Sequence, residues 1–295
     1  MKSAVWGMGS IGSRHYSVLE NMGHQVASVS SHLLRENNFT SIEDCLDKFN
    51  PEYIIVSKIT GEHFNCLQKL DKLNFKGHVL VEKPLFISTL KDRPTYSYSC
   101  GVGYNLRFHP FLIKLKKSLA NIKVDQVMAH CGQYLPDWRP GTNYRDSYSA
   151  SKEQGGGVLR DLSHELDYLN WIFGLSDNIS GSILKLSDLE IETEDTVNIS
   201  MTQEYSAETK VELNYTDKVP RRTLEIKHPQ GEIFVDFIKG SYSKNGEIET
   251  IKIDRNHTYT EMHLDFLNKK EIVASYEEGY QVLEMIQRIE NSKTS

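Results

Sequence analysis

The stretch AVWGMGSIGSRH, residues 4–15, decides the fold of the first part of the chain. An apolar run precedes glycines 7, 9 and 12, and a helical pattern of Tyr16, Leu19 and Met22 follows them. A strand, a glycine turn and a helix in this order bring backbone N–H groups and a helix N-terminus up to a dinucleotide pyrophosphate. A structural strand-to-helix turn is the alternative, since this glycine spacing also occurs by chance. We interpret the turn as a dinucleotide site made by Gly7, Gly9, Ser10, Ile11 and Gly12.

The composition favours a globular enzyme. The 295 residues suffice for two domains, 39% of them are hydrophobic, and no apolar stretch reaches membrane-spanning length. The formal net charge of -6 offers no positive field for nucleic acid. The first strand leaves no room for a signal peptide before it, so we expect a cytoplasmic protein. Wide spacing of Cys45, Cys66, Cys100 and Cys131 favours free thiols over disulfides or a zinc site.

The pattern of predicted helices and strands changes near residue 104, which predicts two domains and an α/β fold class. Residues 1–104 alternate short apolar runs with helical patterns, so we expect a Rossmann domain with a doubly wound parallel sheet. Residues 105–295 are expected to form an α+β substrate and oligomerisation domain with a large, mostly antiparallel open sheet, its last helix able to pack back on the first domain. The predicted strands are 4–6, 26–29, 53–56, 79–81 and 99–102, then 124–134, 179–185, 196–201, 209–215, 223–227 and 232–237.

Two local patterns describe the second sheet. Asn245-Gly246 between polar strand-like runs predicts a two-residue hairpin turn. Val211, Leu213 and Tyr215 alternate with polar residues, which predicts one face packed on the protein. We expect the other face to expose apolar surface that a second copy covers, giving a homodimer or homotetramer.

Gly155-Gly156-Gly157 leads into an apolar segment that predicts one long helix over residues 158–174. Asp161, His164 and Asp167 follow one another at intervals of three, so at least two of them share a helix face. A metal site is one alternative, but no further His or Cys cluster completes it, and we expect none. The other alternative is that His164 is a structural histidine held by hydrogen bonds.

Taken in order, these motifs resemble the glucose-fructose oxidoreductase / inositol dehydrogenase family, written Gfo/Idh/MocA. The resemblance rests on the glycine turn, Glu82-Lys83-Pro84, residues 103–110 (GYNLRFHP), the triple-glycine segment with its Asp and His, and residues 277–283 (EEGYQVL). It implies a nicotinamide-binding Rossmann domain. It also implies hydride transfer at a hydroxyl-bearing carbon of a sugar or cyclitol.

The resemblance also implies roles for individual residues. Lys83 would polarise the reacting oxygen, His164 would transfer its proton, and Asp161 would orient or charge-tune the pair. Glu82 would hold Lys83, and the Lys83-Pro84 bond is a candidate for the cis form. The family pattern has four residues from aspartate to histidine, whereas this chain has three, which puts the role of Asp161 in doubt. A solvated lysine at a strand end is the alternative for Lys83. Cofactor contacts are implied for Thr60, His63, Glu82 and Lys83, and substrate contacts for Lys83, Asn105, Arg107, Asp161 and His164.

The second strand bears on the choice of cofactor. It ends in Ser30-Ser31, where NAD enzymes usually carry Asp or Glu. Without a carboxylate to repel a 2′-phosphate, Ser30, Ser31 and Arg35 favour NADP over NAD, although serine also serves NAD.

The loop 132–145 is the most informative stretch for the substrate. Trp138 and Tyr144 are suited to stack on a ring, and Arg139 and Arg145 to bind a carboxylate or phosphate. An ordered structural loop is the alternative. Loops of this kind resemble enzymes of bacterial surface-sugar synthesis, so a sugar, sugar acid or nucleotide sugar is the expected substrate. Reduction of a C=N or C=C bond and a non-catalytic NAD(P)-sensing protein remain open.

Overall fold

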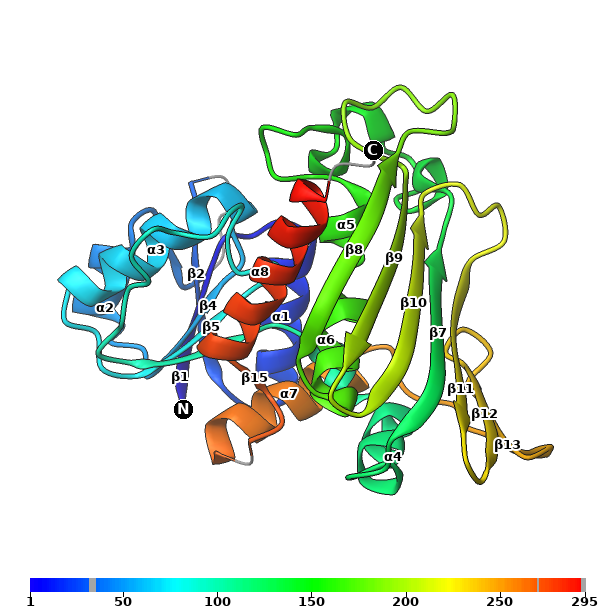
Figure 1. The fold of residues 1–295 in the computed structure, drawn as a ribbon. Coiled ribbons are helices and arrows are strands. Elements are labelled where there is room, and N and C mark those ends of the chain that lie inside the picture. Colours follow the sequence, from blue (N-terminus) through cyan, green and yellow to red (C-terminus); the bar gives the residue numbers. More distant parts are fainter. Residues whose placement is uncertain (32–35, 270, 293–295) are drawn as a thin grey trace. The chain divides into compact units, whose positions relative to one another are not determined.

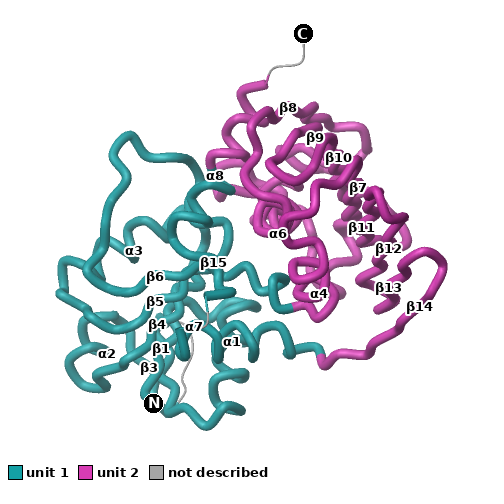
Figure 2. The backbone as a smooth tube through the Cα atoms, turned by 60° about the horizontal axis from the view of Figure 1, so that its bottom comes forward, with its two compact units in different colours: residues 1–108, 255–283 teal, residues 109–254, 284–295 magenta. Residues whose placement is uncertain are grey.

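The computed structural model describes residues 1–31, 36–269 and 271–292, and the chain forms two compact units (Figure 2). Unit 1 combines residues 1–108 with 255–283, and unit 2 combines residues 109–254 with the chain from residue 284 on. Each unit is built on one sheet, drawn in Figure 1.

The sheet of unit 1, here sheet A, is parallel apart from one short edge strand. Its order is β15-β6-β5-β4-β1-β2-β3, and only the β15–β6 pair among its described strands is antiparallel. Strands 3-2-1-4-5-6 are the doubly wound dinucleotide-binding order, so the predicted Rossmann sheet and its five predicted strands are confirmed. The strands are β1 Lys2–Trp6, β2 Gln25–Val29, β3 Asn38–Phe39, β4 Tyr53–Val56, β5 His78–Val81, β6 Ser99–Val102 and β15 Ala274–Ser275.

Helices cover sheet A because several crossovers between its parallel strands are helical: α1 leads from β1 to β2, α2 from β3 to β4, and α3 from β4 to β5. Apolar positions of α1 face the sheet, with Val18 and Leu19 buried. The helices of unit 1 are α1 Ser10–Asn21, α2 Ile42–Lys48, α3 Thr60–Lys72, the 3-10 turn η1 Asn105–Phe108 and α7 His257–Asn268, and α8 Tyr276–Asn291 begins in this unit.

Unit 2 is built on an eight-stranded sheet, here sheet B, with order β14-β13-β12-β11-β7-β10-β9-β8. Only β10 and β7 pair in parallel among its described strands, so the mostly antiparallel prediction is confirmed. The predicted turn joins β13 and β14, with Asn245 and Gly246 at φ 51° and 88°. The strands are β7 Val124–Gly132, β8 Ser176–Leu184, β9 Thr196–Gln203, β10 Ser206–Asn214, β11 Arg221–His228, β12 Gly231–Asp236, β13 Ser241–Lys244 and β14 Glu247–Thr250.

The single long helix expected over residues 158–174 is wrong. The segment forms α5 Val158–Asp161 and α6 His164–Phe173, with Leu162 and Ser163 between them. The backbone tightens at this break: Ser163 N donates to Arg160 O, and Glu165 N donates to Leu162 O, both three residues back. The other helices of unit 2 are α4 Pro110–Ser118 and the 3-10 turns η2 Leu135–Asp137, η3 Tyr144–Asp146 and η4 Tyr148–Ala150.

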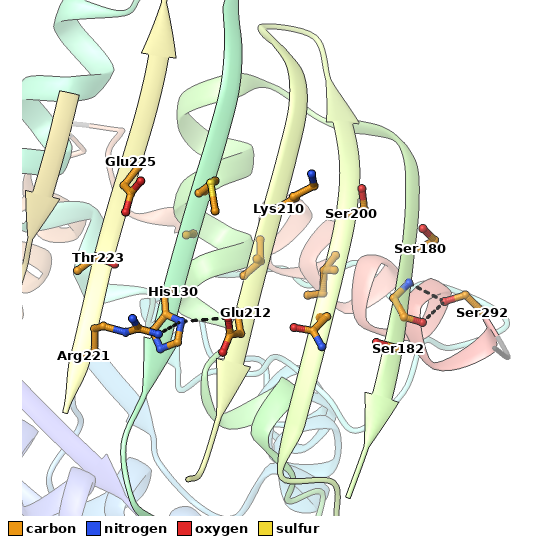
Figure 3. Close-up of a pocket in the computed structure, with 16 residues that line it drawn as sticks. His130, Ser180, Ser182, Ser200, Lys210, Glu212, Arg221, Thr223, Glu225 and Ser292 are labelled. Carbon is orange, nitrogen blue, oxygen red and sulfur yellow. Dashed lines mark hydrogen bonds and ion pairs between the residues drawn. The ribbon is translucent and has the colours of Figure 1, made fainter. Parts of the chain in front are cut away.

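The open face of sheet B carries both polar and apolar side chains, with Met128, Phe234 and Ile248 exposed along one row of paired positions. Figure 3 looks onto this face, where a pocket of about 680 Å³ is lined mainly by polar side chains. Met128 is the one large apolar side chain among its lining residues that is exposed. The sheet thus obeys the alternation of buried and solvated positions, and most outward positions in the pocket carry Ser, Asn, Lys, Glu, Arg or Thr.

The described residues include no helix with the length and apolar character needed to cross a bilayer. Cys45, Cys66, Cys100 and Cys131 are free thiols, as expected.

Candidate active site

The glycine turn lies where sheet A reverses its strand order, between the carboxyl ends of β1 and β4. Gly7 has φ +106°, and a Cβ there would stand 2.7 Å from the Ser57 carbonyl. A Cβ on Gly12 would overlap the Gly7 carbonyl oxygen. Both glycines are therefore required by close packing within the chain.

Gly9 differs from these two glycines, because a Cβ on it would meet no atom of the protein within 4 Å. Gly9 is also the N-cap of α1 and supplies no side-chain cap to the first helical turn. Since nothing in the chain demands glycine here, the empty space and the uncapped helix end fit a bound pyrophosphate. Ser10 is exposed and Ile11 half-buried beside it.

Glu82 and Lys83 follow β5 directly, and the Lys83-Pro84 bond is cis, as expected. Glu82 is 7% exposed, and Lys83 is half-buried. The Glu82 carboxylate accepts the Lys83 backbone N–H at Oε2, 3.1 Å away, and its Oε1 lies 2.8 Å from His15 Nε2. The backbone of the motif is thus anchored by the Glu82 carboxylate.

Thr60 and His63 lie in the first turn of α3, and both are buried. His63 Nδ1 lies 3.1 Å from the Pro84 carbonyl oxygen, and Nε2 lies 3.0 Å from that of Lys58. Burial lowers the pKa of His63 despite these carbonyls. The histidine therefore ties α3 to the segment after Lys83.

The residues predicted to select NADP are only partly described. Ser30 follows β2, and its carbonyl accepts an N–H of the Asn38 side chain at 3.2 Å. Ser31 is exposed, and Arg35 lies outside the described residues.

Asn105 and Arg107 are engaged inside unit 1. The Asn105 amide donates to Thr258 Oγ1 at 2.7 Å, and Arg107, 2% exposed, donates to Glu278 at 2.8 Å. Burial acts to raise the pKa of Glu278, but Arg107 and Ser275 hold it below its usual value. These contacts fasten η1 to α7 and α8.

Asp161 ends α5 and is 6% exposed. Its Oδ2 accepts the hydroxyls of Ser149 and Tyr215, each at 2.6 Å. Burial, reinforced by the Asp161 charge, raises the pKa of Tyr215 and of Tyr148 well above the ordinary phenol value, so both stay hydroxyls. His164, half-buried, opens α6 beyond the break. With three residues per turn at the break, Asp161 and His164 return to one side of the segment.

The loop residues predicted to contact substrate make contacts within unit 2. The Trp138 indole N–H donates to Gln133 O at 3.2 Å, and its ring meets Tyr215 edge-on, centroids 5.2 Å apart. The Arg145 guanidinium pairs with Glu190 and lies over the Tyr144 ring. Arg139, exposed, lies 5.5 Å from the centre of the Tyr148 ring.

A charged cluster also occupies the open face of sheet B, seen at the left of Figure 3. His130 Nε2 lies 2.7 Å from Asp217, and its Nδ1 lies 2.8 Å from Arg221 and 3.5 Å from Glu212. In the described part of the chain, no cluster of three or more His, Cys, Asp or Glu residues suits a metal ion.

The sequence matches two models of one family. Residues 1–93 match the oxidoreductase family with NAD-binding Rossmann fold, and residues 114–234 match the GFO/IDH/MocA C-terminal domain. The chain belongs to the Gfo/Idh/MocA family. The predicted family is thereby confirmed, with its NAD-binding domain.

Two curated relatives are 26% identical to this chain: the provisionally named oxidoreductase YteT of Bacillus subtilis and the uncharacterised oxidoreductase sll0816 of Synechocystis. The matches cover 45% and 56% of this chain, and the chain spans 33% and 49% of those proteins.

Solved structures share the fold over nearly the whole chain. Levoglucosan dehydrogenase in complex with NADH has a TM-score of 0.82 at 15% identity, covering 99% of this chain and 96% of that one. UDP-N-acetylglucosamine 3-dehydrogenase GnnA from Acidithiobacillus ferrooxidans has a TM-score of 0.79 at 17% identity, covering 99% and 97%. The WlbA dehydrogenase from Bordetella pertussis, with NADH and UDP-GlcNAcA, has a TM-score of 0.77 at 18% identity, covering 99% and 95%.

Sequence reasoning missed two histidines beside the Glu82 motif, His15 and His263. Their contact joins residues 248 positions apart, so no local pattern reveals it. The one available hint was a histidine beside Tyr16 on the buried side of the first predicted helix.

Proposed function

We propose that this protein is an NAD(P)-dependent oxidoreductase that transfers a hydride between nicotinamide and the hydroxyl- or keto-bearing carbon of a sugar, sugar acid or nucleotide sugar. The observation that carries it is the glycine turn at the strand-order reversal, where Gly9 leaves space that the protein does not fill. Residues 1–104 bind the dinucleotide, and residues 105–295 bind the substrate. The sugar substrates in the names of levoglucosan dehydrogenase and GnnA support the substrate class.

The dinucleotide, when bound, supplies the hydride acceptor or donor, and the chain must handle the proton and the charge on oxygen. Lys83 places a positive charge or hydrogen bond at the reacting oxygen, where electrostatic stabilisation acts. His164 gives or takes the hydroxyl proton. Asp161, held by two hydroxyl donors, orients His164 and keeps negative charge near it.

The finer assignments belong to the same proposal. Ser30 and Ser31 replace the carboxylate that would repel a 2′-phosphate, which favours NADP, while the relatives cited above hold NADH. Cytoplasmic location, a role in bacterial surface-polysaccharide synthesis, and a homodimer or homotetramer stay predictions. An assembly through the open face of sheet B would need polar contacts.

The test distinguishes a loss of cofactor binding from a loss of folding stability by comparing substitutions at two glycines. Gly9→Val adds a side chain where the protein has room, so the variant should keep the wild-type melting temperature but lose NAD and NADP binding in calorimetric titration. Gly12→Ala is the matched control. Its added methyl group would clash with the Gly7 carbonyl oxygen, so this variant should have a lower melting temperature. Dinucleotide binding of wild-type affinity by Gly9→Val would overturn the assignment. Screening wild type with both cofactors against sugars, sugar acids and nucleotide sugars then defines the substrate.

A further inference from the structure

A buried chain of four polar side chains runs through unit 1, and the proposed chemistry uses only its last member. It joins Tyr53 at the start of β4, His263 of α7, His15 of α1 and Glu82 after β5; the first three have 0% exposure. The Tyr53 hydroxyl lies 2.7 Å from His263 Nδ1, His263 Nε2 lies 2.9 Å from His15 Nδ1, and His15 Nε2 lies 2.8 Å from Glu82 Oε1.

The chemistry of Tyr53 and Glu82, at the two ends, decides which residue donates in each hydrogen bond of the chain. Burial, helped by the Glu82 charge, raises the pKa of Tyr53 well above its ordinary value, so Tyr53 remains a hydroxyl that can donate to His263 Nδ1. Burial lowers the pKa of His263 well below its ordinary value, so this ring is neutral. Its one proton then lies on Nε2 and is donated to His15 Nδ1.

His15 must then carry its proton on Nε2, from which it donates to the Glu82 carboxylate. All three hydrogen bonds therefore point toward Glu82. Burial acts to raise the pKa of Glu82, but the hydrogen bond from His15 and the charge and N–H of Lys83 hold it below its ordinary value. A Cβ on Gly103 would stand 2.9 Å from Oε1, so the carboxylate is closely packed.

We propose that Tyr53, His263 and His15 are positioning residues for Lys83: their one-directional hydrogen bonds hold Glu82 as a fixed carboxylate, and Glu82 holds the Lys83 backbone through its N–H. The proposal rests on the proposed function where it concerns turnover. The proton arrangement itself is independent of any activity. Hydrogen bonds that polarise one another in a dry interior act as a unit, so a change at the far end is transmitted to Lys83.

The test removes one oxygen at that far end, in Tyr53→Phe. Without the hydroxyl, His263 Nδ1 loses its hydrogen-bond donor, so one of the two end contacts that keep the His263 proton on Nε2 is removed and the second tautomer becomes populated. Ring nitrogen shifts in NMR should show His15 and His263 as pure Nε2–H forms in wild type and as mixtures in the variant. The Lys83 amide should exchange with solvent about tenfold faster, and kcat should fall about tenfold with KM unchanged.

Tyr98→Phe is the matched control. Tyr98 is also buried, and its hydroxyl donates to the Leu67 carbonyl at 2.7 Å, outside the chain. This variant should leave the histidine forms, Lys83 exchange and kcat as in wild type. A proton on Nδ1 of His15 in wild type, or equal Lys83 exchange in the two variants, would overturn the proposal. Absence of turnover in wild type, with the NMR results as expected, would instead refute the proposed function.

Discussion

The two segments that carry the proposed catalytic groups are held by different kinds of contact. Glu82 and Lys83 depend on a charged carboxylate and two buried histidines drawn from different helices. Asp161, beside His164, is held by the hydroxyls of Ser149 and Tyr215, which are neutral donors. A buried charge that loses its partner costs several kcal/mol, whereas one hydroxyl donor among two costs less. Loss of any one contact should therefore destabilise the Glu82 segment strongly, whereas loss of one hydroxyl donor should destabilise the Asp161 segment less.

The largest expected effect is on catalysis, where both segments should prove equally necessary. Lys83→Ala removes charge stabilisation and His164→Ala removes the proton carrier, so each should lower turnover by at least about 100-fold. Cofactor affinity, measured by titration, should change little. If the two act as a unit, the double variant loses far less than the product of the single losses. Full turnover by His164→Ala would move the proton role to Tyr144 or Asp161.

The next largest effect is on the free energy of unfolding, which should differ between variants of the two segments. Glu82→Gln should cost about 3 kcal/mol of unfolding free energy near neutral pH, because it removes a carboxylate that accepts hydrogen bonds from His15 and the Lys83 N–H. Tyr215→Phe should cost about 2 kcal/mol, since Ser149 still donates to Asp161.

The pH dependence of the Glu82 effect follows from its lowered pKa. The carboxylate stabilises the fold above its unfolded value of 4.5, and that stability is lost as the pH falls through the lower folded pKa. The gap between wild type and Glu82→Gln in denaturant melts should therefore close in acid. A gap that stays constant down to about pH 3 contradicts a carboxylate held in its charged form.

The smallest effect concerns the loop near Asp161. Arg145 is exposed and pairs with Glu190, so Arg145→Ala should leave the melting temperature unchanged. If Arg145 also binds an acidic substrate, KM for that substrate rises while kcat holds, and Glu190→Ala, the matched control, leaves KM alone. An unchanged KM in both variants would reduce Arg145 to a loop contact.

Local patterns predicted what local physics decides. The glycine turn, the five parallel strands and the Asn245-Gly246 hairpin all follow from neighbours in sequence. The break between α5 and α6 was missed because helical spacing of apolar residues continues across it. The substrate roles of Asn105 and Arg107 stay predictions, and their hydrogen bonds to Thr258 and Glu278 could not be predicted because only the folded chain brings these residues together.

The division of unit 1 into two pieces of chain has a consequence for its synthesis. Residues 1–108 leave the ribosome first, but α7, which supplies His263, follows only after nearly all of unit 2. At roughly 5–20 residues per second, the 248 positions between His15 and His263 correspond to a delay on the order of tens of seconds. During that time Glu82 and His15 have been synthesised, but His263 and the rest of α7 have not. Folding of unit 1 is thus tied to the synthesis of α7.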